Sequence, residues 1–215
     1  MTALIFDMDG VIVNSTTMHS RAWEAYLHQH GLRAPDLQSR MLGKHNDELV
    51  RDLFPKETLT EALICEHGRR KEALYREMML PVLEENLVPG IREFILRHAG
   101  QPMGIATNAE PANVDCVLGS TSLSGYFRAI VSGSAVRPKP FPDIYLRVAD
   151  MLGYAPGDCV VFEDSMTGVQ AALAAGAKVV GVTTTLSTFP DIDLTIRDFL
   201  DPGLEPWLHQ LSVAR

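Results

Sequence analysis

Two carboxylates at the end of a short apolar run could perform nucleophilic and acid-base chemistry. Asp7 and Asp9 follow the run Ala3–Phe6, and Gly10 comes directly after them. Residues two apart in an extended chain point to the same side, so both carboxylates could face one ligand. One could attack phosphorus while the other transfers a proton. A solvated acidic turn explains the same residues, and for an isolated Asp-x-Asp it is the better interpretation.

The second apolar run, Met103–Ala106, also ends in polar side chains. Thr107 and Asn108 offer a hydroxyl and an amide that could bind phosphate oxygens. The helical pattern that follows would add N–H groups, which favour an anion at a helix start. Thr-Asn before a helix is by itself usually an N-cap, so the pair is informative only in combination with other residues.

A lysine and two acids follow the third and fourth runs. Lys139 lies between two prolines, where a stiff loop would hold its positive charge in place. Glu163 and Asp164 come at the end of the run that begins at Cys159. With Asp7 they would form a compact oxygen-ligand site for Mg²⁺, which prefers carboxylates and accompanies phosphates. A lone lysine in a loop is normally only a solvated surface group, and the two acids are also explained as a capping pair for the helix that follows.

These residues require a fold that brings the ends of separate runs together. Short apolar runs without alternation recur along the chain: Ala3–Phe6, Met103–Ala106, Ala129–Val131, Cys159–Phe162 and Val179–Val182. Helical patterns lie between them: Ile91–His98 leads into the second run, and the patterns that follow the second, third and fourth runs are Pro111–Leu118, Asp143–Leu152 and Met166–Ala175. Such runs are typical of strands buried on both faces, and the alternation predicts a parallel α/β sheet. Ligands bind beyond the carboxyl ends of such strands.

A long insertion separates the first run from the second, far longer than one crossover needs. Met18, Ala22 and Tyr26 recur four residues apart, and Thr58–Leu80 is a second helical stretch. We therefore predict a core of residues 1–13 and 84–215, with a small helical lid at 14–83.

Composition excludes several classes of function. With 19 Lys and Arg against 27 Asp and Glu, the net charge is −8, so the chain offers no broad cationic surface to nucleic acid. The three cysteines are far apart and form no Cys-x-x-Cys pair, which is typical of reduced thiols in a cytoplasmic protein. No apolar stretch reaches the roughly 20 residues of a membrane span, and the first residues lack the pattern of a signal peptide.

The ordered set of motifs resembles the haloacid dehalogenase (HAD) superfamily, most closely its β-phosphoglucomutase-like branch with a helical cap. The resemblance covers essentially the whole chain and rests on Phe6–Ser15, Thr107-Asn108, Lys139-Pro140 and Glu163-Asp164-Ser165-x-x-Gly168. It implies an α/β fold with a Rossmann-like three-layer parallel-sheet core and an inserted small α-helical cap domain. It also implies dependence on Mg²⁺ and an aspartyl-phosphate intermediate.

The resemblance assigns roles to the residues that carry it. Asp7 would be the nucleophile and Asp9 the general acid and base. Thr107, Asn108 and Lys139 would hold the phosphoryl group.

The same resemblance places the metal among the acids. Asp7, Asp164 and the backbone carbonyl of Asp9 would bind Mg²⁺, and Glu163 would support the site from beside Asp164. Dehalogenases of the superfamily usually carry an aromatic residue in place of Asp9, because halide departure needs no proton. Asp9 therefore favours phosphoryl transfer.

The cap is expected to select the substrate. The candidate residues there are His19, Lys44, His45, Asn46 and Arg76. His19 lies in a stretch similar to the family's first cap helix, where a histidine approaches the site. Lys44 to Asn46 lie in one similar to its recognition loop, Met41–Leu49. A surface histidine and a solvated helix start explain these residues without a functional role.

Two departures distinguish the chain from the family's mutases. These typically carry Gly-x-x-Arg in the recognition loop, whereas three residues after Gly43 this chain has Asn46. They also tend to have Ser-Ala-Ser where this chain has Thr107-Asn108-Ala109. A neutral asparagine cannot replace a bidentate guanidinium as a phosphate ligand.

We therefore predict a cytoplasmic, Mg²⁺-dependent phosphatase of small phosphorylated metabolites, above all sugar phosphates. A β-phosphoglucomutase-type phosphohexomutase is the first alternative, and a non-catalytic binder of phosphorylated ligands is a remote one. The expected partner is a small phosphorylated metabolite, with no nucleic acid and no membrane. Oligomeric state stays open, and a monomer is compatible with the sequence.

Overall fold

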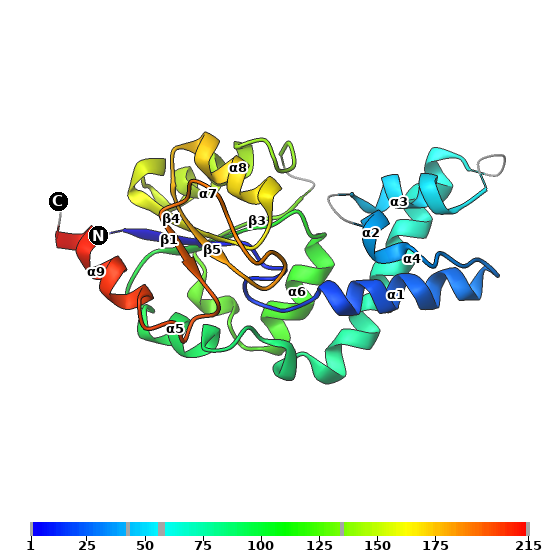
Figure 1. Ribbon diagram of the computed structural model, residues 1–215, viewed down its shortest axis with the longest axis horizontal. Coiled ribbons are helices and arrows are strands. Elements are labelled where there is room, and N and C mark those ends of the chain that lie inside the picture. Colours follow the sequence, from blue (N-terminus) through cyan, green and yellow to red (C-terminus); the bar gives the residue numbers. More distant parts are fainter. Residues whose placement is uncertain (1, 42–43, 56–58, 134–135, 214–215) are drawn as a thin grey trace. The chain divides into compact units, whose positions relative to one another are not determined.

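A parallel β-sheet forms the centre of the larger of two units. The computed structural model describes residues 2–41, 44–55, 59–133 and 136–213. Within them the strands follow the order β3-β2-β1-β4-β5-β6, and every neighbouring pair is parallel (Figure 1). The strands are β1 Ala3–Phe6, β2 Met103–Ala106, β3 Ala129–Val131, β4 Cys159–Glu163, β5 Lys178–Val182 and β6 Leu194–Ile196. The predicted α/β fold class is confirmed.

Helices cover both faces of this sheet. Those of the larger unit are α5 Ile91–Arg97, α6 Pro111–Ser120, α7 Asp143–Leu152, α8 Met166–Ala175 and α9 Leu204–Val213. The helices α7 and α8 lie on one face, and α5 and α6 lie on the other (Figure 1). Ser165 caps the start of α8, where its hydroxyl accepts the Gly168 N–H at 3.1 Å, and Gly176 caps the end of the helix in a left-handed conformation. The polar residues at its start therefore have a fixed position.

Alternating residues of β1 and β4 form two different cores. Ile5 and Val161 face α7 and α8 and belong to a cluster of small and branched side chains. Phe6 and Phe162 face the other way, are partners in the register of the two strands, and stack with ring centroids 4.9 Å apart. Both rings also contact Phe94 of α5. This stack reinforces the register that sets where each strand ends.

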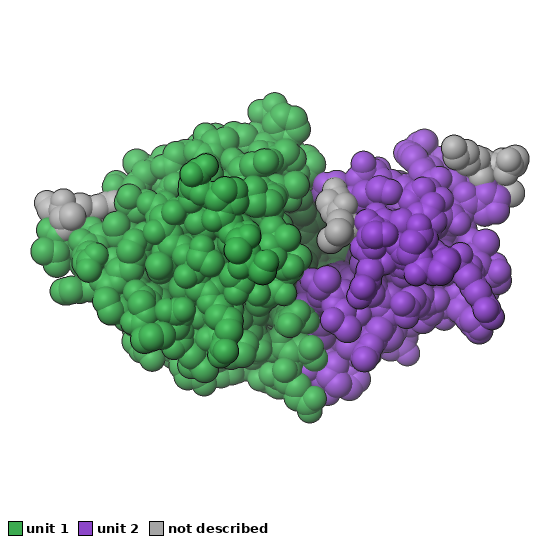
Figure 2. Space-filling model, in the orientation of Figure 1, with its two compact units in different colours: residues 1–14, 83–215 green, residues 15–82 purple. Residues whose placement is uncertain are grey.

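Residues 15–82 form the smaller, helical unit, and residues 1–14 and 83–215 form the larger one (Figure 2). The helices of the smaller unit are α1 Thr16–Gln29, α2 Leu37–Met41, α3 Asn46–Leu53 and α4 Glu61–Met79. Trp23, Tyr26 and Leu27 of α1 are buried in its core with Ile64 of α4. Thr58, where the second helical stretch was expected to begin, lies outside the described residues. Across the described ranges, no helix combines the length and apolar character needed to cross a membrane.

Truncation of Phe199 tests the aromatic side of the sheet. This side chain is 5% exposed and lies 5.0 Å from Phe94 and 5.3 Å from Phe162, between ring centroids. We expect Phe199→Ala to lower the free energy of unfolding by about 3–5 kcal/mol, because it leaves a cavity among the rings. Urea denaturation followed by circular dichroism measures the loss.

The neighbouring residue supplies the control. Leu200 is 65% exposed, so Leu200→Ala should change the free energy of unfolding by no more than about 0.5 kcal/mol. Equal losses for the two variants would contradict the packing described for Phe199.

Candidate active site at the carboxyl end of the sheet

Three buried acids meet where the central strands end. Asp7 follows β1, and Glu163 and Asp164 lie at the end of the neighbouring strand β4. All three are buried, and each offers a carboxylate oxygen within 4.8 Å of the others. The parallel register of β1 and β4 explains the meeting, since equal strand ends bring the residues that follow to one edge.

Lys139 joins two of these acids. Its buried Nζ donates to Asp7 Oδ1 at 2.6 Å and to Glu163 Oε1 at 2.5 Å. The preceding loop is tied down as well, because the Lys139 backbone N–H donates to Asn108 Oδ1 at 3.2 Å. The peptide bond between Lys139 and Pro140 is cis. Sequence reasoning expected a fixed positive charge here, and the contacts supply a cause for its position.

Glu163 is held by a dense set of donors. Its Oε2 accepts the backbone N–H groups of Asp164 and Ser165 at 3.2 and 3.3 Å and the Ser165 hydroxyl at 3.0 Å. The Tyr145 hydroxyl donates to Oε1. A Cβ at position 168 would lie 1.9 Å from Glu163 Cδ, so only glycine fits there. With these bonds, Glu163 is arranged to position Lys139.

Asp164 lies against the turn that carries the first acids. A Cβ on Gly10 would lie 1.9 Å from Asp164 Oδ2, and Gly10 also has a positive φ of 76°. Two threonines after β5 complete this side: Thr185 donates to Asp164 Oδ2, and Thr184 donates to the Gly10 carbonyl at 2.5 Å. Glycine is therefore required at position 10 for both space and backbone conformation.

The expected phosphate ligands follow β2, next to β1 in the sheet. Thr107 is buried, and its Oγ1 accepts the Ala109 N–H at 3.1 Å. Asn108 is bonded to the Lys139 backbone, as described above, and a Cβ on Gly133 would lie 2.3 Å from the Asn108 carbonyl oxygen. The loop after β2 is thereby packed closely against the segment after β3.

The acids repel one another strongly in this buried place. Burial raises the pKa of Asp7 well above its usual value; Lys139 opposes this shift, while Glu163, Asp164 and Asp9 add to it. The pKa of Asp164 is raised to about 7, first by burial and then by Glu163, with Asp9 contributing. Burial acts to lower the pKa of Lys139, but the two carboxylates together raise it. Asp9 therefore lies within electrostatic reach of the cluster.

This charge balance tests whether a divalent cation fits. When ionised, the three buried carboxylates carry more charge than the ammonium group of Lys139 neutralises. Oxygen ligands at this spacing suit a hard cation such as Mg²⁺. Among the described residues, the set of converging acids comprises Asp7, Glu163 and Asp164 and does not include Asp9. The residues present fit the metal.

In the smaller unit, the structure brings only some of the expected residues together. His19 and Asn46 meet around Lys71 and Glu72 of α4. Lys44 instead pairs with Asp52 at 3.0 Å.

The other expected residues of this unit have separate places. His45 is the N-cap of α3, where its backbone N–H donates to Glu48 Oε2 at 2.9 Å. Arg76 is half-buried on α4. Leu42 and Gly43 of the expected recognition loop lie outside the described residues.

Sequence reasoning missed several residues that touch these clusters. Thr184 and Thr185 follow the fifth strand, so the strand-end rule applied once more would have found them. Tyr145 lies in the first turn of α7, and no sequence motif around it indicated a place in the site. Lys71 and Glu72 are typical of a solvated helix face by sequence, and only the packing of α1 on α4 shows that they are buried.

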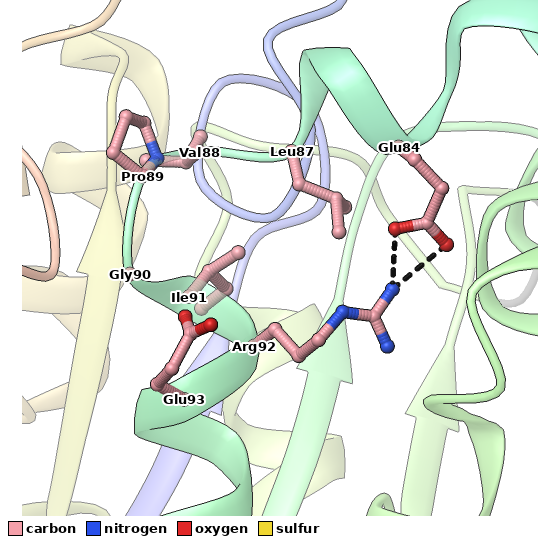
Figure 3. A pocket seen from close by; sticks show the side chains of 8 residues that line it. All are labelled: Glu84, Leu87, Val88, Pro89, Gly90, Ile91, Arg92 and Glu93. Atoms are coloured by element: carbon pink, nitrogen blue, oxygen red, sulfur yellow. Dashed lines mark hydrogen bonds and ion pairs between the residues drawn. The ribbon is translucent and has the colours of Figure 1, made fainter.

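A cavity of about 220 Å³ lies elsewhere in the larger unit. Figure 3 shows its wall, in which Arg92 reaches across to the carboxylate of Glu84 with contacts of 2.8 and 2.6 Å. The lining residues are Glu84, Leu87, Val88, Pro89, Gly90, Ile91, Arg92 and Glu93. None of these lining residues belongs to the candidate active site.

Known proteins are similar to this chain in both sequence and fold. The fructose-1-phosphate phosphatase YqaB of Escherichia coli (strain K12) is 36% identical over 183 residues, which cover 83% of this chain and 95% of that protein. A β-phosphoglucomutase of Bacillus subtilis (strain 168) is 30% identical over 188 residues, covering 85% of this chain and 83% of that protein. The crystal structure of a β-phosphoglucomutase from Clostridium difficile has a TM-score of 0.84 at 22% identity and covers 100% of both chains; at that identity it shows the fold alone.

A family model extends the match along most of the chain. It is described as haloacid dehalogenase-like hydrolase and matches residues 1–176, a range that includes the ends of β1, β2, β3 and β4. The superfamily expected from the motifs is thereby confirmed. The chain belongs to the haloacid dehalogenase-like hydrolases.

Proposed function

We propose that this protein is a Mg²⁺-dependent phosphatase of small phosphorylated metabolites, above all sugar phosphates. The observation that carries the proposal is the buried cluster in which Lys139 bonds Asp7 and Glu163 beside Asp164. A carboxylate at this strand end can act as a nucleophile, while the ammonium group offsets its repulsion from an anionic substrate. The phosphatase relative YqaB supports the same reaction class.

In the proposed reaction, the chain uses two carboxylates in turn. An Asp7 oxygen attacks phosphorus, the bond from phosphorus to the leaving oxygen breaks, and Asp9 gives that oxygen a proton. Asp9 then takes a proton from the water that attacks the acyl phosphate, which releases inorganic phosphate and restores Asp7. Lys139, Thr107 and Asn108 bind and orient the phosphoryl oxygens. Mg²⁺, held by Asp7, Asp164 and the Asp9 carbonyl, would neutralise phosphoryl charge.

Phosphohexomutase activity is the second candidate, because a β-phosphoglucomutase is among the relatives. A mutase needs a second phosphate site, and two lysines of the helical unit are engaged by acids. Lys44 pairs with Asp52, and Lys71 pairs with Glu72 at 2.6 Å. With Asn46 where mutases typically carry arginine, these contacts favour hydrolysis over isomerisation.

Phosphate release provides the primary test. We expect turnover of a sugar-monophosphate panel in Mg²⁺, loss of turnover in EDTA, and a loss of at least about 10³-fold in kcat for Asp7→Asn, because an amide cannot form the acyl phosphate. Asp115 is exposed on α6, so Asp115→Asn makes the same chemical change outside the cluster and should keep activity within about twofold. Turnover that is indifferent to EDTA, or a normal single-turnover burst with Asp7→Asn, would refute the proposal.

The balance of products separates phosphatase from mutase. With β-glucose 1-phosphate as substrate and glucose 1,6-bisphosphate as primer, we expect free phosphate to exceed glucose 6-phosphate. Loss of a charge-assisted contact to the distal phosphate weakens its binding by about one to two orders of magnitude, so water should intercept the intermediate. Coupled assays measure the ratio of the two products. A predominance of glucose 6-phosphate would establish the mutase instead.

The acids also predict how metal binding depends on pH. The pKa of Asp164 is raised from 3.8 to about 7. Protonated Asp164 therefore stabilises the metal-free protein below pH 3.8, and this stabilisation is lost as the pH rises through 7. Mg²⁺ requires the ionised carboxylate. The increase in Tm on replacing EDTA with Mg²⁺ should therefore be larger at pH 8 than at pH 6. Asp164→Asn should reduce both the increase and its pH dependence; a larger increase at pH 6 would contradict the assignment.

A further inference from the structure

Two consecutive threonines, Thr184 and Thr185, join the two chain segments that carry the proposed metal ligands. This threonine pair follows β5, which lies next to β4 in the sheet. The Thr185 hydroxyl donates to Oδ2 of Asp164, the residue just beyond β4. The Thr184 hydroxyl donates to the Gly10 carbonyl at 2.5 Å, in the turn after β1. One dipeptide therefore connects a carboxylate after β4 with the turn that contains Asp9.

The backbone of the threonine pair starts from a fixed position. The Thr183 N–H donates to the Ile196 carbonyl of β6 at 2.9 Å, and the Thr184 N–H donates to the Val182 carbonyl at 2.9 Å. The strand β5 itself is paired with β4 on one side and with β6 on the other. The two hydroxyls are thus presented by a strand with neighbours on both sides, and they can restrain the groups that they bind.

The groups that they bind have little room of their own. The Gly10 N–H donates to the Val13 carbonyl at 2.7 Å, and the same peptide group carries the Asp9 carbonyl. Thr184 bonds the next peptide group along, so the chain is held on both sides of Gly10. A Cβ on Gly10 would lie 1.9 Å from Asp164 Oδ2, which shows how closely the turn and this carboxylate approach. Two of the proposed ligands are therefore kept at one spacing.

The spacing of these ligands bears on which divalent cation the site prefers. Mg²⁺ demands near-ideal octahedral geometry with oxygens at about 2.0–2.1 Å, whereas Ca²⁺ accepts flexible arrangements of oxygens at about 2.3–2.6 Å. Oxygen ligands that are free to move apart therefore weaken Mg²⁺ binding more than Ca²⁺ binding. Because the two ions carry the same charge, a change that alters only the electrostatics of the site affects both alike.

We propose that the threonine pair makes the site selective for Mg²⁺ over Ca²⁺, by fixing the spacing between the Asp9 carbonyl and the Asp164 carboxylate. The inference rests on the proposed function, in which these oxygens bind Mg²⁺. Both threonines are positioning residues, because they act through the groups that would hold the ion. Thr184 is half-buried and Thr185 is exposed, so neither is needed to fill the core.

Thermal-shift titrations with MgCl₂ and with CaCl₂ test the proposal, because the rise in Tm gives a Kd for each ion without turnover. Thr184→Val and Thr185→Val each remove one hydroxyl and keep the shape of the side chain. Each should weaken Mg²⁺ binding by about tenfold or more and Ca²⁺ binding by no more than about threefold. Thr184→Ser and Thr185→Ser keep the hydroxyl, and the ratio of the two Kd values should stay within about threefold of the wild type.

A control variant makes the same chemical change on the neighbouring strand. Thr195 is exposed on β6, so Thr195→Val should leave the activity and both Kd values within about twofold of the wild type. Equal losses of Mg²⁺ and Ca²⁺ binding in the valine variants of the threonine pair would overturn the inference. Unchanged Kd values in these variants, or a wild type that binds no Mg²⁺, would overturn it as well.

The titrations also separate the failure of this inference from the failure of the proposed function. Mg²⁺-dependent turnover of sugar monophosphates, with an unchanged ratio of Kd values in Thr184→Val and Thr185→Val, would support the phosphatase proposal and overturn the role of the threonine pair. Absence of turnover in the wild type, with the expected change in that ratio, would do the reverse.

Discussion

The candidate site depends on a buried ammonium group placed between carboxylates. Lys139 bonds Asp7 and Glu163, and without it these acids would repel each other in a place with little water. The contact also joins the end of β1, the loop after β3 and the end of β4. Glu163 in turn is held by backbone N–H groups and by Tyr145. The position of Asp7, the proposed nucleophile, is thus set by Lys139, which Glu163 in turn holds in place.

Much of this arrangement could be predicted from the order of residues along the chain. Apolar runs without alternation predicted β1 to β5, and the strand-end rule then indicated Asp7, Lys139 and Asp164 as neighbours. The strand β6 and the helix α2 escaped notice because segments of three and five residues carry too little periodicity. Tyr145 and Glu72 were missed for another reason. The contact of Tyr145 with Glu163 and the burial of Glu72 depend on what packs against them, which local patterns do not encode.

The core by itself does not distinguish the reactions of its relatives. A phosphatase and a phosphoglucomutase each match more than four fifths of this chain. Positioned carboxylates and a lysine would serve both reactions if, as proposed above, each begins with transfer of the phosphoryl group to Asp7. The difference must therefore come from residues that decide whether a second anionic group is held. In the helical unit, Lys44 is paired with Asp52 and Lys71 with Glu72, so an acid already engages each of these cations.

The stack of Phe6 on Phe162 has a consequence for how the family can diverge. These rings pair β1 with β4 immediately before Asp7 and Glu163, and a slip of one residue would turn the acids to opposite faces of the sheet. The packing of these two rings and the position of the acids are therefore linked. Substitutions in the helical unit leave this pairing unchanged, whereas the loss of either ring would disturb the core and the position of the acids together.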